Sequence, residues 1–193
     1  MHPFIMTASG EDFWFLNPAP ETILIEDIAA ALSKICRYTG HCRHFYSVAQ
    51  HSVIVSHLVP EEQALEGLLH DASEAYLGDM SAPLKRQLPE YQEIEGIVES
   101  AIAKKFGLMY NLDLGWPSAV KRADIQVLAL EKKLLLPESK TPWGILDGVE
   151  CPDEKLLHHC WQPVVAELRF LQRFVELTSA AAATRDEPVG QAG

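Results

Sequence analysis

The sequence reads Leu68-Leu69-His70-Asp71-Ala72-Ser73-Glu74-Ala75-Tyr76-Leu77-Gly78-Asp79 at its most informative point. In a helix, Glu74 lies three residues after Asp71 and four after His70, so it shares one face with both side chains. An imidazole and a carboxylate on a buried helix are ligands that suit a divalent cation. Two ligands do not hold a catalytic metal, so we expect other segments to supply more.

Length, composition and charge limit the class of protein. The chain has 193 residues, of which 48% are hydrophobic and 22% charged, as expected for one globular domain. Its net charge of −11 argues against binding a nucleic-acid polymer or an anionic membrane. The sequence shows no signal peptide and no apolar run of membrane-spanning length, so we expect a cytoplasmic protein with its four cysteines reduced.

The hydrophobic pattern predicts an all-α fold, a single helical bundle. We expect an irregular or hairpin-like entry over residues 1–24, a helical domain over 25–178 and a disordered tail over 179–193. Spacings of three and four, with Gly and Pro as stops, predict helices that begin near Glu26, at Ser47, at Pro60, near residue 90, at Pro117 and near residue 153. Ser47 and Gln50 form a Ser-x-x-Gln capping box, and the helix from Pro60 is expected to run to Gly78.

Two further helices each offer an inward polar side chain. His51 lies in the first turn of an apolar face, where a hydrogen-bonded core histidine is the common alternative. Asp124 lies among apolar neighbours, where burial requires a cation or a donor, and a salt bridge to Lys121 would also satisfy it. With His70 and Asp71, these residues make a set of two imidazoles and two carboxylates, which suits Mn²⁺, Fe²⁺, Co²⁺, Ni²⁺ or Zn²⁺.

The order His51, His70-Asp71 and Asp124 on a helical chain resembles the HD-domain superfamily of metal-dependent phosphohydrolases. The resemblance extends over most of residues 26–136. It includes the strings Tyr46-Ser47-Val48-Ala49-Gln50-His51-Ser52, His70-Asp71-Ala72-Ser73-Glu74-Ala75-Tyr76-Leu77-Gly78-Asp79 and Ala82-Pro83-Leu84-Lys85. The bacterial branch that acts on nucleotides, including 5′-deoxynucleotidases, is the nearest likeness. It implies an HD-type bundle that removes phosphate from (deoxy)nucleoside 5′-monophosphates.

The resemblance also implies roles for individual residues. His51, His70, Asp71 and Asp124 would bind one divalent metal ion, Glu74 would position or activate the attacking water, and Asp79 would contact the substrate. A cation lowers the pKa of its water and offsets phosphoryl charge, and a nearby carboxylate can accept the proton. A homodimer is an expectation that rests on the resemblance alone.

A phosphate group also requires cations from the protein. Arg37, Arg43 and Lys85 are the candidates, since a guanidinium can hold phosphate through two hydrogen bonds, although each could also be a solvated charge. Familiar deoxynucleotidases of this superfamily carry an Arg-Trp pair ahead of the first histidine. Here that space holds residues 41–46; we expect the reader of the base within residues 37–46, with His41 or Tyr46 lining the pocket.

Other interpretations use the same residues. Two Cys/His groups could form small zinc sites, although neither has Cys-x-x-Cys spacing; they are Cys36, His41, Cys42 and His44, and Cys151, His158, His159 and Cys160. The alternative enzyme is a nucleoside triphosphate, phosphodiester or alarmone hydrolase, and the non-enzymatic alternative is a nucleotide sensor. Trp14, Trp116 and Trp143 could each stack on a base, with packing as the alternative.

Overall fold

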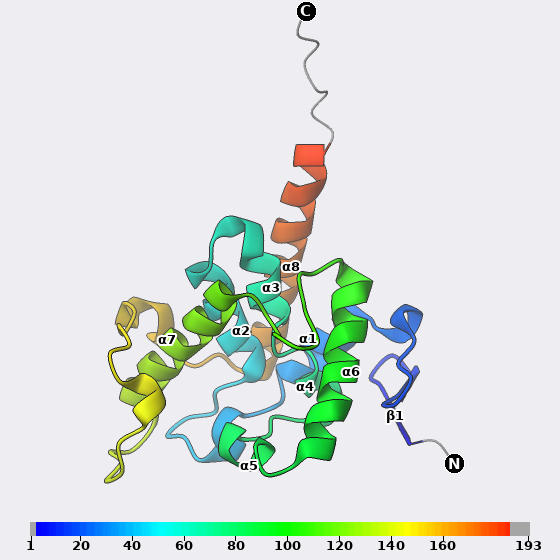
Figure 1. Cartoon of the computed structure of the whole chain (residues 1–193). Coiled ribbons are helices and arrows are strands. Elements are labelled where there is room, and N and C mark those ends of the chain that lie inside the picture. Colours follow the sequence, from blue (N-terminus) through cyan, green and yellow to red (C-terminus); the bar gives the residue numbers. More distant parts are fainter. Residues whose placement is uncertain (1–2, 186–193) are drawn as a thin grey trace, which may run out of the picture.

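The computed structural model describes residues 3–185, with side chains described up to Ser179, and it is mostly helical, as predicted (Figure 1). The helices are α1 (Ile25–Leu32), α2 (Val48–Leu58), α3 (Ala64–Leu69), α4 (Glu74–Leu77), α5 (Ala82–Lys85), α6 (Pro89–Phe106), α7 (Ser118–Leu135) and α8 (Pro163–Arg185). Short 3₁₀ turns cover Pro20–Thr22, Arg37–Gly40, Glu61–Gln63, Gly144–Leu146 and Glu154–Leu157. Within the described part of the chain, none of these helices has the length and apolar character needed to cross a membrane.

The N-terminal entry is a small antiparallel hairpin of β1 (Phe4–Met6) and β2 (Asp12–Trp14). Its inward residue Phe13 is fully buried and stacks on Tyr76, with ring centroids 3.8 Å apart. The turn of the hairpin is held by Asp27 of α1, whose carboxylate accepts from the Ser9 backbone N–H at 2.8 Å and from the Ser9 hydroxyl at 2.6 Å. The hairpin therefore docks on α1 and α4.

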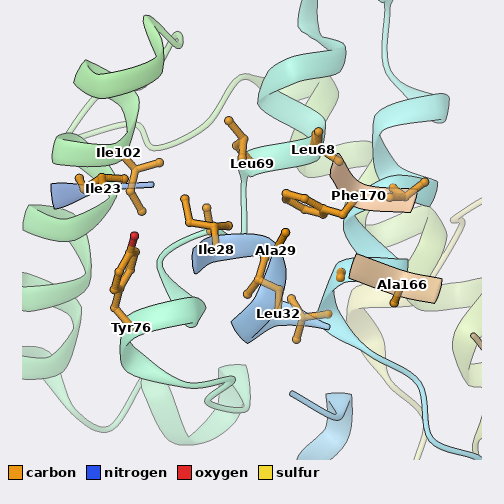
Figure 2. Close-up of a cluster of buried hydrophobic side chains, with 14 of the residues drawn as sticks. Ile23, Ile28, Ala29, Leu32, Leu68, Leu69, Tyr76, Ile102, Ala166 and Phe170 are labelled. Carbon is orange, nitrogen blue, oxygen red and sulfur yellow. The ribbon is translucent and has the colours of Figure 1, made fainter. Parts of the chain in front are cut away.

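The main core surrounds α1, which is short and almost entirely apolar (Figure 2). Its buried residues Ile28, Ala29 and Leu32 lie one turn or less apart, so one face meets the neighbouring elements. On the other side α8 packs against α1, α2 and α3, and it contributes Ala166 and Phe170, four residues apart and both fully buried. This packing fixes α2 and α3 side by side, which positions the polar residues described below.

The start of α2 agrees with the predicted cap only in part. The Ser47 hydroxyl accepts from the Gln50 backbone N–H at 3.2 Å, as an N-cap should. The Gln50 side chain does not return to Ser47. Its amide donates to the His159 carbonyl and accepts from the Trp161 backbone N–H, both at 2.8 Å, so Gln50 ties α2 to the segment before α8.

The predicted continuous helix from Pro60 to Gly78 is wrong. A 3₁₀ turn, α3, a tight turn over residues 70–73 and α4 take its place. In the tight turn the backbone N–H groups of Ala72, Glu74 and Tyr76 donate to carbonyls three residues earlier, not four. His70 and Asp71 therefore leave the end of α3 in a tightened turn, which changes their directions relative to those in a regular helix.

The predicted disordered tail is wrong for residues 179–185, because α8 continues to Arg185. Alanine has the highest intrinsic helix propensity, so Ala180–Ala183 favour continuation of the helix into the segment that we expected to be disordered. Residues 186–193 of the predicted tail lie outside the described residues.

Candidate metal centre and its pocket

Three predicted ligands converge from three segments of the helical core. His51 lies on α2, His70 directly follows α3, and Asp124 lies on α7; one ligand atom of each lies within 4.8 Å of the other two. The Nε2 atoms of the two histidines are 3.3 Å apart, and Asp124 Oδ1 is 3.2 Å from His51 Nε2 and 4.0 Å from His70 Nε2. Two imidazoles and a carboxylate at these separations are a group that could hold a divalent metal ion.

The second ring nitrogen of each histidine has a hydrogen-bond partner behind the site. His70 Nδ1 donates to the Gly67 carbonyl at 2.9 Å, and His51 Nδ1 lies 2.7 Å from Glu131 Oε1. A carbonyl or a carboxylate can only accept here, so these contacts place a proton on each Nδ1 and turn each Nε2 toward the centre, where it can bind a metal ion once it carries no proton. This arrangement is typical of histidines that bind metals.

Asp71 lies against the same centre but also faces a cation. Its Oδ2 atom is 3.3 Å from His70 Nε2 and 3.5 Å from His51 Nε2. The same oxygen is 3.4 Å from an Arg37 guanidinium nitrogen. The structure therefore brings all four predicted ligands together, with Asp71 shared between the histidines and Arg37.

A buried acid that the sequence interpretation missed supports this group. Glu131 of α7 is fully buried and contacts His51, Arg37 and the Tyr38 hydroxyl. Burial alone would raise the Glu131 pKa, but Arg37 and His51 outweigh it and hold that pKa at about 2. A signal was present, because Glu131 follows Asp124 by seven residues, which is two turns along the same helix face.

The charges of this buried group also shift the pKa values of His51 and Asp124. Burial and Arg37 lower the His51 pKa, but Glu131 and Asp124 raise it to about 9. Burial raises the Asp124 pKa, yet His51, His70 and Arg37 leave it well below the usual range. In the absence of a metal ion, the group is thus a network of mutually stabilised charges.

Arg37 enters this network from a strained turn. Tyr38 and Thr39 have φ values of 58° and 54°, in the left-handed region that residues other than glycine rarely occupy. The Tyr38 hydroxyl donates to Glu131, and Arg37 Nε lies 3.3 Å from the same carboxylate. These contacts hold the turn in place, and such strain is common at functional sites.

Glu74 is the buried carboxylate nearest in sequence to the ligands. Its side chain is buried, and its Oε2 atom has no hydrogen-bond partner among the described residues. Burial, reinforced by Asp71 and Asp79, raises its pKa well above the usual range. A buried oxygen without a partner is costly, so it marks a place where a ligand or water would be satisfied.

An open pocket of about 830 Å³ leads to this centre. Asp71, Glu74 and Asp124 line its inner end, and Arg37, His41, Asp79 and Lys85 lie around it. Burial raises the Asp79 pKa above its usual range, whereas the Lys85 ammonium is paired with Glu95. The predicted substrate-binding residues Arg37, Asp79 and Lys85 are therefore all at the pocket, although both cations already have carboxylate partners.

The expectations for residues 41–46 are met only in part, because His41 lines the pocket whereas Arg43 and Tyr46 do not. Arg43 does not line the pocket; its backbone N–H donates to the Leu135 carbonyl, and its guanidinium lies 3.5 Å from the Leu134 carbonyl, at the end of α7. The end of a helix presents unpaired carbonyls, which attract a cation. Tyr46 is fully buried in the core, so of the two suggested pocket residues only His41 lines it.

The alternative zinc sites do not form within the described part of the chain. Cys36 Sγ and Cys42 Sγ are 3.7 Å apart, but no third ligand joins them at metal-binding separation. Cys151 is exposed, and His158 and His159 pack edge to face on each other. Asp124 likewise makes no ion pair with Lys121, because its carboxylate points to the histidines.

Comparison with known proteins found relatives of this chain, whereas no family model matches it. The sequence is 45% identical over 146 residues to the uncharacterized protein YfdR of Escherichia coli (strain K12), covering 76% of this chain and 80% of that protein. It is 37% identical over 133 residues to an uncharacterized protein of Rhodobacter capsulatus, covering 64% of this chain and 68% of that protein.

Proposed function

The chain belongs to the same family as YfdR of Escherichia coli, and we propose that it is a metal-dependent phosphohydrolase that removes phosphate from (deoxy)nucleoside 5′-monophosphates. The observation that carries this proposal is the convergence of His51, His70 and Asp124, with both histidine Nδ1 atoms engaged behind them. We further infer that the helical domain is an HD-type bundle, because the ligands follow the order His, His-Asp, Asp along the chain, on α2, directly after α3 and on α7.

The donor set fits one divalent transition metal ion. His51, His70, Asp71 and Asp124 would hold it, since imidazole and carboxylate suit Mn²⁺, Fe²⁺, Co²⁺, Ni²⁺ or Zn²⁺. A bound ion of this kind would supply Lewis-acid activation of water and neutralise charge on phosphoryl oxygens. The buried Glu74 oxygen without a partner is consistent with the same interpretation, because Glu74 lines the pocket beside the ligands.

The protein residues then divide the work of hydrolysis. Glu74 accepts the proton of the attacking water, whose oxygen bonds to phosphorus while the bond from phosphorus to the 5′ oxygen breaks. The departing oxygen takes up a proton, and the products are a nucleoside and inorganic phosphate. Arg37, Lys85 and Asp79 line the same pocket. Arg37 and Lys85 would attract the phosphate, and Asp79 would accept a hydrogen bond from the sugar.

Metal content and phosphate release, measured over a panel of nucleotides, test this proposal. We expect wild type to contain one transition metal ion and to release phosphate from monophosphates, Asp71→Ala to be inactive, and Glu74→Gln to keep the metal but lose turnover. Glu90→Gln, on the exposed first turn of α6, is the matched control and should behave as wild type.

An active Asp71→Ala protein would refute the mechanism. Release of pyrophosphate or triphosphate would favour the alternative, a nucleoside triphosphate hydrolase. Nucleotide binding by a metal-loaded wild type without turnover would favour the sensor. A homodimer remains part of the proposal and is tested by light scattering of the purified chain.

A further inference from the structure

The outer end of the pocket has a different chemical character from its inner end. Trp143, Gly144 and Ile145 line the outer end, and they belong to the Pro/Gly-rich connection between α7 and α8. Ile125 and Leu128 of α7 also line the pocket. The pocket therefore passes from carboxylates at the metal centre to an aromatic and aliphatic surface.

Helix α7 sets the distance between these two ends. Asp124, Leu128 and Lys132 are spaced by four residues and follow one face of the helix. Eight residues of helix rise by about 12 Å. The Lys132 ammonium lies 4.9 Å from the centre of the Trp143 ring, so the indole is held about two turns along α7 from the metal ligand. That is the length scale of a phosphate, a sugar and a base in line.

The ammonium also determines which part of the indole is free. Lys132 lies over the ring but does not line the pocket, whereas Trp143 does. Lys132 thus covers one face of the ring, and a cation–π contact of this kind steadies the ring. Trp143 is only half-buried and Ile145 is 54% exposed, so both side chains leave apolar surface accessible at the pocket.

The geometry points to a base-binding subsite in which Trp143 stacks on the nucleobase while Ile145, Leu128 and Ile125 enclose its edge. This inference rests on the proposed function, because it assumes that the phosphate occupies the metal end of the same pocket. Trp143 and these aliphatic side chains offer ring and apolar surface and no hydrogen-bond pattern specific to one base. Since every base has an aromatic face, the subsite should accept purines and pyrimidines and discriminate against phosphate esters without a ring.

The assignment differs from the sequence expectation, which placed the reader of the base in residues 37–46. From that segment Arg37, Tyr38, Thr39 and His41 line the pocket, but the one tryptophan among the lining residues is Trp143. Stacking on an aromatic side chain changes nucleotide affinity by roughly 10-fold to 100-fold per base. A substitution of Trp143 should therefore have a measurable effect.

The test compares wild type, Trp143→Ala and Trp143→Phe on AMP, CMP and ribose 5-phosphate, which carries the same phosphate ester without a base. We expect Trp143→Ala to lower kcat/KM for both nucleotides by at least 10-fold and for ribose 5-phosphate by less than 3-fold. Trp143→Phe should recover most of the loss. Trp14→Ala, which changes an exposed tryptophan on β2 outside the pocket, is the matched control and should match wild type. Equal losses on all three substrates, or no loss on any, would overturn the subsite.

A binding measurement separates failure of the subsite from failure of the proposed function. Calorimetry with AMP is performed on metal-loaded Glu74→Gln, alone and combined with Trp143→Ala. If wild type hydrolyses no ester but the added Trp143→Ala change weakens AMP binding at least 10-fold, the phosphohydrolase proposal is refuted and the base-binding subsite is supported. If wild type hydrolyses nucleotides but neither AMP binding nor kcat/KM depends on Trp143, the phosphohydrolase proposal is supported and the base-binding subsite is refuted. Absence of both AMP binding and hydrolysis overturns the subsite as well.

Discussion

Replacing Glu131 by glutamine should reveal how strongly the metal centre depends on a side chain that would not bind the metal. Glu131 is fully buried on α7 and meets Arg37, the Tyr38 hydroxyl and His51 Nδ1. The substitution removes one negative charge and replaces one of two accepting oxygens by an amide NH2, in a side chain of nearly the same shape. Arg37 is then left in the interior with Asp71, 3.4 Å away, as its remaining carboxylate partner.

The structure sets the expected size of the effect. Removing one partner of a buried ion pair costs about 3–5 kcal/mol, because the other charge stays buried without compensation. Since glutamine still accepts a hydrogen bond and Asp71 still faces Arg37, we expect the lower part of that range, about 3 kcal/mol. Loss of the carboxylate behind His51 should also weaken metal affinity by about 10-fold to 100-fold.

Urea unfolding in the presence of a chelator measures the first effect without any contribution from metal binding. Calorimetric titration with Mn²⁺ or Zn²⁺ measures the second. The matched control is Glu154→Gln, since Glu154 is paired with Lys133 at 2.6 Å but both side chains are more than half exposed. An exposed pair contributes about 0–1 kcal/mol. If Glu131→Gln and Glu154→Gln lower the free energy of unfolding equally, the reasoning about the buried network is refuted.

Three further predictions concern the scaffold and the metal. Ser47→Ala should lower stability by about 1 kcal/mol in urea unfolding, because the Gln50 backbone N–H loses its cap; an unchanged midpoint would contradict this assignment. Gly67→Ala should destabilise the protein by about 1–3 kcal/mol, measured by thermal unfolding. The added Cβ would lie 3.0 Å from Val59 Cγ2 and 3.1 Å from Ser56 Cα, where α2 and α3 approach closely. Full stability of this variant would show that the packing here is loose. Saturation with metal at about 100 times Kd should stabilise by about 2.7 kcal/mol, which raises Tm by roughly 5–10 °C, reversibly with chelator; a Tm that does not respond to metal would count against the centre.

The helical character of the chain and the residues of the centre could be read from the sequence. Helix periodicity and the stops at Gly107 and Pro137 are local properties, and local sequence reports them well. The polar residues His51 and Asp124 stood out because each lies on an otherwise apolar face, where an unpaired polar group is costly. The cost of burying an unpaired polar side chain is a property of that residue, so the argument does not require knowing which group it will contact.

Packing decided the features that depend on more than one segment. The Pro60–Gly78 helix breaks at residues 70–73, where the i→i−3 hydrogen bonds that replace the helical pattern do not follow from periodicity. The Gln50 side chain binds backbone groups of His159 and Trp161 instead of capping its own helix. The Arg43 guanidinium contacts the Leu134 carbonyl at the end of α7 instead of lining the pocket. A polar side chain takes the nearest compatible partner in space, and sequence spacing gives that partner only within one element.

The same distinction applies to the site. The sequence by itself determined which side chains could bind a divalent ion, because ligand chemistry belongs to the residue type. Only the tertiary structure placed Glu131 behind His51 and Trp143 at the far end of the pocket, 80 residues and 92 residues after His51 in the chain. Their roles come from the packing of α7 against α2 and of the following connection against α7, and this long-range packing is a property of the whole core.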